Sequence, residues 1–123
     1  MKTLLIVDDE IDIREFAKRF FTKKGIEVLC ASNGKEALKI IENITPDLML
    51  LDVNMTEMDG VETLEYLRSK GSKIKIIMVT GVEEKEVVDK ITQLGIKGLI
   101  NKPLILNELQ DVVLKELGIE LDH

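Results

Sequence analysis

The sequence has few of the features that mark secreted, membrane or redox proteins. It contains one cysteine, Cys30, so no intramolecular disulfide can form, and a reducing compartment fits best. No run of apolar residues is long enough to cross a bilayer. The apolar run near the start is interrupted by Asp8, Asp9 and Glu10, too early for a signal peptide. These absences favour a cytoplasmic protein.

An excess of acidic residues excludes further classes of function. The chain has 23 Asp and Glu residues against 17 Lys and Arg, a net charge of -6. Nucleic-acid and anionic membrane surfaces require clustered basic residues, so we expect no direct binding to nucleic acid and none to membranes. The single histidine, His123, is the last residue of the sequence, and we assign it no role.

The residues that are present suit one globular domain. The chain has 123 residues, of which 45% are hydrophobic and 33% are charged. We expect a domain over residues 1–119 and a short tail over residues 120–123. The start of the sequence and this short tail favour a protein that acts alone.

Short apolar runs alternate five times with amphipathic stretches. The apolar runs predict strands at residues 3–7, 26–30, 48–51, 74–79 and 99–100. Helical spacing of apolar residues predicts a helix after each of them, the first with a stripe at Ile13, Phe16, Ala17 and Phe20. Strands without polar alternation are buried on both faces, as in a parallel sheet covered by helices. The pattern therefore predicts an α/β fold with five strands and five helices.

Polar residues follow four of the five predicted strands. Asp8 and Asp9 follow the first strand, Asp52 the third, Thr80 the fourth and Lys102 the fifth. The carboxyl ends of parallel strands meet at one edge of a sheet, where sites form at the topological switch point. We therefore expect these side chains to lie close together.

Such a cluster suits phosphoryl chemistry. Three carboxylates in one cleft repel each other, and a divalent cation such as Mg²⁺ relieves that repulsion. Lys102 supplies a second positive charge and Thr80 a hydroxyl donor. A carboxylate in these surroundings can attack phosphorus. Each residue alone would be read as a helix cap, turn residue or solvated lysine, and only their joint placement favours a site.

The same residues lie in motifs that resemble the receiver domain of bacterial two-component response regulators, in the form of a stand-alone chemotaxis-type regulator. The resemblance follows the order and spacing of the family over essentially the whole chain. The matching stretches are LIVDDE at residues 5–10, DLMLLD at 47–52, NM at 54–55, MDG at 58–60, VTG at 79–81 and NKP at 101–103.

This resemblance implies a flavodoxin-like sheet with strand order 2-1-3-4-5 and a phosphorylation-controlled signalling function. Asp52 looks like the phosphoacceptor, and Thr80 and Lys102 would contact the phosphoryl group. The donor would be a phosphohistidine on a sensor histidine kinase or a histidine phosphotransfer protein. The phosphorylated form would act on a downstream protein, and catalysis would be limited to the phosphorylation and dephosphorylation of the domain itself.

The resemblance also implies a site for Mg²⁺, or Mn²⁺ in its place. Asp9 resembles the direct ligand, and Asp8 a ligand that acts largely through water. Asp52 would contribute a carboxylate oxygen and Asn54 its backbone carbonyl.

The sequence departs from the family pattern at several positions. Thr56 replaces the usual proline, Gly81 a common alanine, and Leu99 the usual tyrosine or phenylalanine, so an aromatic switch is not available. Val82 lies two residues past Thr80, beside the expected path of the attacking water. An apolar group there predicts slower autodephosphorylation than in a Val82→Glu variant.

Three other functions compete with this interpretation. A small aspartyl-phosphate phosphatase usually carries Asp-x-Asp after its first strand, whereas Asp8 and Asp9 are adjacent. A flavin mononucleotide carrier needs a first loop that cradles phosphate, and this acidic loop would repel it. A degenerate receiver that binds partners without phosphorylation would not be expected to keep all the polar residues.

The start of the first predicted helix is the candidate surface for the kinase. Ile11 and Ile13 lie beside the site, and both cannot easily face the core. We expect at least one of them to contact the phosphodonor protein, against the alternative that both pack internally.

Overall fold

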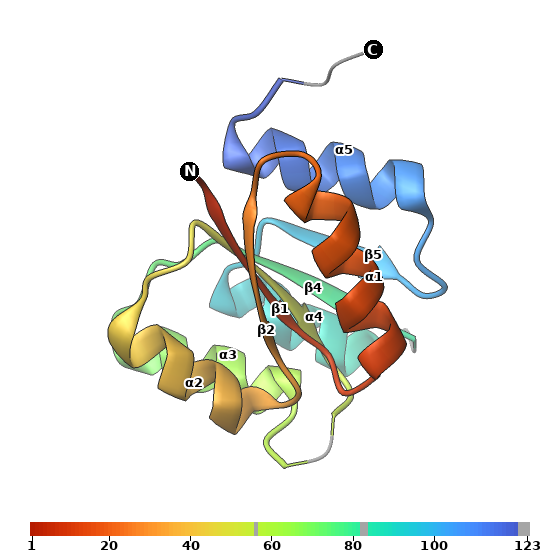
Figure 1. Cartoon of the computed structure of the whole chain (residues 1–123). Helices are drawn as coiled ribbons and strands as arrows, with labels where there is room; N and C mark the ends of the chain where they lie inside the picture. Colours follow the sequence, from red (N-terminus) through yellow and green to blue (C-terminus); the bar gives the residue numbers. More distant parts are fainter. Residues whose placement is uncertain (56, 82–83, 121–123) are drawn as a thin grey trace.

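Five short apolar segments form the strands of one parallel sheet in the computed structural model, which describes residues 1–55, 57–81 and 84–120. Within these described residues, five helices alternate with the strands (Figure 1). The strands are β1 (Thr3–Val7), β2 (Glu27–Ala31), β3 (Leu48–Asp52), β4 (Ile76–Thr80) and β5 (Gly98–Asn101). The helices are α1 (Ile11–Thr22), α2 (Gly34–Asn43), α3 (Gly60–Ser69), α4 (Lys85–Leu94) and α5 (Leu106–Leu117).

The strand order β2-β1-β3-β4-β5 confirms the predicted flavodoxin-like fold. All four strand pairs are parallel. This order places β1 and β3 side by side near the centre of the sheet. β2 lies on one side of β1, and the strands from β3 onward are added on the other side, so the topological switch point lies between β1 and β3. In open sheets of this type, the crevice beyond the carboxyl ends of these strands is where ligands bind.

Each central strand supplies alternate side chains to two separate cores. Leu4 and Ile6 of β1 pack with α1 and α5 on one face, whereas Leu5 and Val7 pack with α2, α3 and α4 on the other. Figure 1 shows the same division, with α1 and α5 together and α2 and α3 across the sheet from them. Burial on both faces accounts for the continuous apolar runs in the sequence.

The core-facing stripe of α1 differs from the predicted one. Ala17 and Phe21 are buried, four residues apart, whereas the ring of Phe16 is 42% exposed. Phe20 is half-buried and lies against both rings, with centroids 6.3 Å from Phe16 and 4.9 Å from Phe21. The prediction was wrong because three phenylalanines fall on adjacent faces of one short helix, and periodicity alone did not identify which face is inward. Predicted bounds of β2 and β4 were also early by one or two residues.

The segment after β3 brings glycine directly against the backbone of Asp52. The Gly60 N–H donates to the Val53 carbonyl at 3.0 Å, and α3 begins at Gly60 behind an N-terminal capping box of Asp59 and Glu62. A Cβ atom on Gly60 would lie 2.1 Å from the Asp52 carbonyl oxygen. Only glycine therefore fits here, and the close approach holds the start of α3 against the end of β3.

Some expectations fall outside the described residues. These include Thr56, Val82 and the tail beyond residue 120, so the domain limits and the slow autodephosphorylation stay predictions. None of the helices in the described part of the chain has the length and apolarity that a membrane span needs.

Substituting Gly60 with alanine is expected to lower the free energy of unfolding by about 2 kcal/mol or more, because a backbone carbonyl occupies the space of the new methyl group. Urea denaturation measures the change. Gly81→Ala is the matched control, since, apart from its chain neighbours, no atom of the described residues lies within 4 Å of a Cβ built there. A Gly60→Ala variant as stable as Gly81→Ala would contradict this prediction.

Candidate functional site

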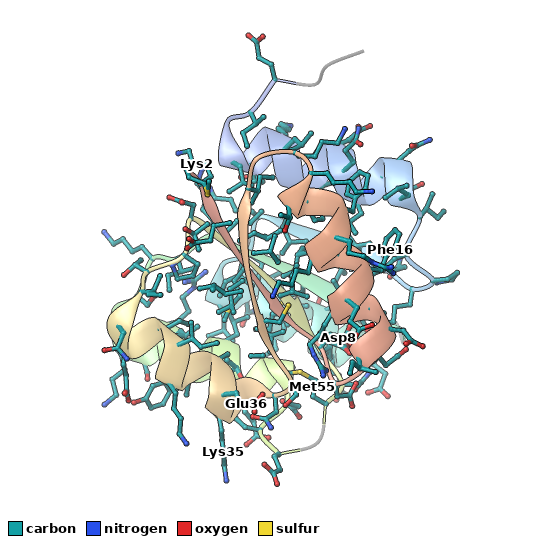
Figure 2. The ribbon with its side chains drawn as sticks, in the orientation of Figure 1. Lys2, Asp8, Phe16, Lys35, Glu36 and Met55 are labelled. Atoms are coloured by element: carbon teal, nitrogen blue, oxygen red, sulfur yellow. The ribbon has the colours of Figure 1, made fainter. Side chains whose placement is uncertain are left out.

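The ends of four strands place the predicted residues at one edge of the sheet, where Figure 2 labels Asp8. Asp8 follows β1, Asp52 ends β3 and Thr80 ends β4, and each of these residues is buried. Lys102 follows β5, and its backbone N–H donates to the Thr80 carbonyl at 2.8 Å. This bond extends the β4–β5 ladder by one residue and sets the starting point of the Lys102 side chain.

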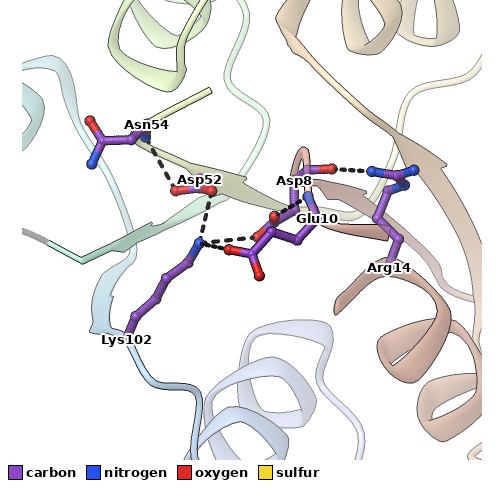
Figure 3. Close-up of polar contacts among 6 residues, drawn as sticks. All are labelled: Asp8, Glu10, Arg14, Asp52, Asn54 and Lys102. Atoms are coloured by element: carbon purple, nitrogen blue, oxygen red, sulfur yellow. Dashed lines mark hydrogen bonds and ion pairs between the residues drawn. The ribbon is translucent and has the colours of Figure 1, made fainter. Parts of the chain in front are cut away.

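The Lys102 ammonium lies among three carboxylates (Figure 3). Its Nζ is 3.0 Å from Asp52 Oδ2, 3.4 Å from Glu10 Oε1 and 3.6 Å from Asp8 Oδ2. The structure therefore brings together Asp8, Asp52 and Lys102, as we expected from topology, and adds Glu10 to them.

Asp52 is held at both carboxylate oxygens. Oδ1 accepts the Asn54 N–H at 3.2 Å, and Oδ2 accepts from Lys102. Burial raises the pKa of the Asp52 carboxyl above its ordinary value, and the bonds from Lys102 and Asn54 offset only part of this rise. The charged form of this carboxylate is therefore poorly solvated, and few other hydrogen-bond donors compete for its oxygens. Both properties favour its reaction with an electrophile.

Asp8 is also buried and also held at both oxygens. Oδ1 accepts the Glu10 N–H at 2.9 Å, while Oδ2 faces Lys102. Burial raises the pKa of this carboxyl, and the negative charge of Asp52 adds to the rise against the opposing effect of the Glu10 N–H bond. Arg14 donates through Nη1 to the Asp8 backbone carbonyl at 2.7 Å, which ties the β1–α1 turn to the first turns of α1.

Lys102 remains firmly protonated in these surroundings. Burial acts to lower the pKa of its ammonium, but the hydrogen bond to Asp52 and the charges of Asp52, Asp8 and Glu10 outweigh burial and raise it. The site therefore has a fixed positive charge beside the buried acids.

The β1–α1 turn carries a set of oxygen donors that suits a hard divalent cation. Carboxylate oxygens of Asp8, Asp9 and Glu10 lie within 4.8 Å of one another, and Asp8 is buried whereas Asp9 and Glu10 are exposed. Mg²⁺ prefers oxygen ligands, one or two of them carboxylates, and retains several waters. An exposed pair of acids beside a buried one fits these requirements.

Sequence reasoning missed the contacts of Glu10 and Arg14. Glu10 belongs to the acidic run after the first strand, and that run was the available signal. Arg14 lies one helical turn after Glu10, on the face of α1 that returns to the turn. Arg14 donates to a backbone carbonyl, and such a contact cannot be recognised from the types of residues in a sequence.

The structure also places three further positions that the sequence analysis singled out, Leu99, Ile11 and Ile13. Leu99 is half-buried and packs against the core that α2, α3 and α4 share. Ile11 is 58% exposed and Ile13 is half-buried, so one of the pair faces outward as expected. Whether Ile11 contacts a phosphodonor protein stays a prediction.

The family follows from comparison with known proteins. A model of the response regulator receiver domain matches residues 4–114. Sporulation initiation phosphotransferase F of Bacillus subtilis is 34% identical over 117 residues, which cover 95% of this chain and 94% of that protein. Regulatory protein AtoC of Escherichia coli is 35% identical over 95% of this chain, which spans only 25% of that longer protein.

Solved structures agree with this result. A receiver domain protein described as CheY-like, from Methanospirillum hungatei JF-1, superposes with a TM-score of 0.90 at 32% identity, covering 96% of this chain and 94% of that one. The chain belongs to the response regulator receiver domain family of two-component systems. Receiver domains are signalling modules that bind Mg²⁺ at an acidic pocket and interact with histidine kinases or phosphotransfer proteins. The phosphatase alternative is not favoured.

Neutralising Asp8 is expected to stabilise the metal-free protein at neutral pH. Asparagine keeps the acceptor for the Glu10 N–H and removes a buried charge. Because the folded-state pKa is raised, the folded protein binds this proton more readily than the unfolded chain, and stability declines as the pH rises through that pKa. The gain in Asp8→Asn should therefore be largest at neutral pH and shrink on acidification.

Urea denaturation in the presence of a chelator, repeated across a pH series, measures this gain. Asp111→Asn, which removes an exposed charge from α5, is the control. If Asp8→Asn gains no stability at neutral pH relative to this control, the buried charge of Asp8 does not destabilise the fold.

Proposed function

We propose that Asp52 accepts a phosphoryl group from a phosphohistidine of a sensor histidine kinase or a histidine phosphotransfer protein. The observation that carries the proposal is the buried Asp52 carboxylate, held 3.0 Å from Lys102 at the carboxyl edge of the sheet. Membership of the receiver family supports the same chemistry. The domain over residues 1–119 would then signal from the cytoplasm to a downstream protein through its surface.

The transfer would be Mg²⁺-dependent, and this edge of the sheet supplies the protein groups that it needs. A carboxylate oxygen of Asp52 forms a bond to phosphorus as the phosphorus–nitrogen bond breaks, and the electron pair of that bond stays with the histidine ring. Lys102 stabilises negative charge on the phosphoryl oxygens, and the Thr80 hydroxyl donates to one of them. Asn54 holds the attacking carboxylate through its N–H.

Four residues would hold the cation: Asp8, Asp9, Asp52 and, through its backbone carbonyl, Asn54. When bound, Mg²⁺ or Mn²⁺ offsets the repulsion of the acids and the charge of the phosphoryl group. Both oxygens of Asp8 are already engaged by Glu10 and Lys102, which supports an indirect role through water. Asp9 is exposed on the same turn, which supports direct ligation.

The expected catalytic activity is limited to the domain's own phosphorylation and dephosphorylation. The acidic turn and Asp52 serve one covalent step, on the protein itself. Among the described residues, the cavity that Asp8 and Asp52 both line has a volume of only about 10 Å³, which is too small for a separate substrate.

Incubation with acetyl phosphate and Mg²⁺ is expected to add one phosphoryl group, and Asp52→Asn should abolish the addition because the nucleophile is lost. Intact-mass spectrometry measures the product. Asp47→Asn is the control, since Asp47 lies at the opposite end of β3 and accepts from the Thr3 N–H. Full labelling of Asp52→Asn would refute the assignment.

Asp9→Asn is expected to weaken Mg²⁺ binding about ten-fold or more, which corresponds to about 1.4 kcal/mol. The reason is the loss of a charged ligand, and Asp8→Asn should have a smaller effect because it acts through water. Isothermal titration calorimetry measures the affinities. Asp12→Asn removes an equal charge from the neighbouring first turn of α1 and is the control. Equal affinities of Asp9→Asn and Asp12→Asn would count against direct ligation.

A further inference from the structure

The side chain of Glu10 contacts Lys102 instead of capping the helix that it precedes. Glu10 is the N-cap residue of α1, with extended backbone angles, and its side chain makes no capping hydrogen bond. Its carboxylate lies 3.4 Å from Lys102 Nζ, across 92 positions of sequence. The side chain is therefore directed at the site and away from its own helix.

The backbone of Glu10 is fixed on both sides. Its N–H donates to Asp8 Oδ1 at 2.9 Å, and its carbonyl accepts the Arg14 N–H at 3.2 Å in the first turn of α1. A fixed backbone sets how far the carboxylate can reach. The contact with Lys102 thus depends on the length of the glutamate side chain.

Lys102 has little donor capacity to spare. An ammonium carries three N–H donors, and three carboxylates already surround this one at 3.0, 3.4 and 3.6 Å. Asp8 and Asp52 are buried, whereas the Glu10 side chain is 59% exposed. A phosphoryl oxygen that comes to Lys102 must displace one of these carboxylates, and the exposed one costs least to displace.

Glu10 also borders a surface groove beside Lys102. Together with Lys102 and Gly81, it lines a groove of about 630 Å³ between α1 and the segment after β5. The Glu10 carboxylate is thus open to solvent on the side of the groove that Lys102 also lines.

We propose that Glu10 is a positioning residue that holds Lys102 in the unphosphorylated protein and competes with the incoming phosphoryl group for its ammonium. The inference rests on the proposed phosphorylation of Asp52. Glu10 then slows phosphorylation by donors that do not themselves move its side chain, and a partner protein that draws Glu10 away from Lys102 gains an advantage over small phosphodonors. Glu10 is in this way a specificity-determining residue.

The test compares rates of phosphorylation by acetyl phosphate at saturating Mg²⁺. In this reaction Asp52 bonds to phosphorus, the bond between phosphorus and the acyl oxygen breaks, and acetate leaves with its electron pair. Glu10→Gln removes the charge. Glu10→Asp keeps the charge but shortens the side chain by one methylene group, which withdraws it from Lys102. Asp12→Asn removes an equal charge from the same groove without a contact to Lys102 and is the control.

We expect Glu10→Gln and Glu10→Asp to be phosphorylated about two- to five-fold faster than the wild type, the range set by the small coupling of an exposed ion pair. Asp12→Asn should match the wild type. Acceleration of Glu10→Gln alone would show repulsion of the donor in place of competition for Lys102. Acceleration of Asp12→Asn to the same degree would show a general charge effect.

Slower or unchanged rates in both Glu10 variants would overturn the inference as well. Failure of the proposed function has a different signature. If the wild type gains no phosphoryl group, or gains it at a residue other than Asp52, the assignment of Asp52 fails together with the role of Glu10. If the wild type is labelled on Asp52 and the Glu10 variants are labelled at the wild-type rate, the role of Glu10 is refuted and the assignment of Asp52 stands.

Discussion

The contact between Lys102 and Asp52 is the interaction on which the site depends. A carboxylate with 2% exposure is costly to ionise, and burial without a partner would leave Asp52 protonated and unreactive. The ammonium at 3.0 Å offsets part of that cost and leaves a charged but poorly hydrated nucleophile. The Asn54 N–H holds the other oxygen of Asp52, and the contacts of Arg14 and of the Glu10 N–H shape the turn that carries the acids.

The sheet makes this contact possible without any local motif. Asp52 comes from β3 and Lys102 follows β5, with β4 between them in the sheet. The Val53 N–H donates to the Val79 carbonyl at 2.8 Å, and the Lys102 N–H to the Thr80 carbonyl at the same distance. These two bonds align the ends of three strands, so the long lysine side chain reaches across one strand to the carboxylate.

The number of strands and their ends could be predicted from sequence because continuous apolar runs, each closed by a polar residue, are a strong signal, whereas the strand order was implied by the resemblance to receiver domains. Asp52 and Lys102 were found in this way. What could not be predicted depends on how each helix is rotated about its axis and on the local path of the backbone. The periodic stripe of α1 placed Phe16 inward, whereas Phe21 fills the core. Likewise, Arg14 acts on a backbone carbonyl, and such partners are set by the path of the chain and not by residue type.

The division of the interior into two cores has a mechanical consequence. The sheet separates two layers of helices whose cores share no side chains. Helices on one side can therefore move while the packing on the other side stays intact. Individual helices differ in how firmly they are anchored: α5 buries four side chains, whereas α4, described throughout, buries only Ile91 fully. Few buried contacts make a segment the cheapest to displace. A displacement of α4 would therefore leave the core packing of α1, on the opposite side of the sheet, unchanged.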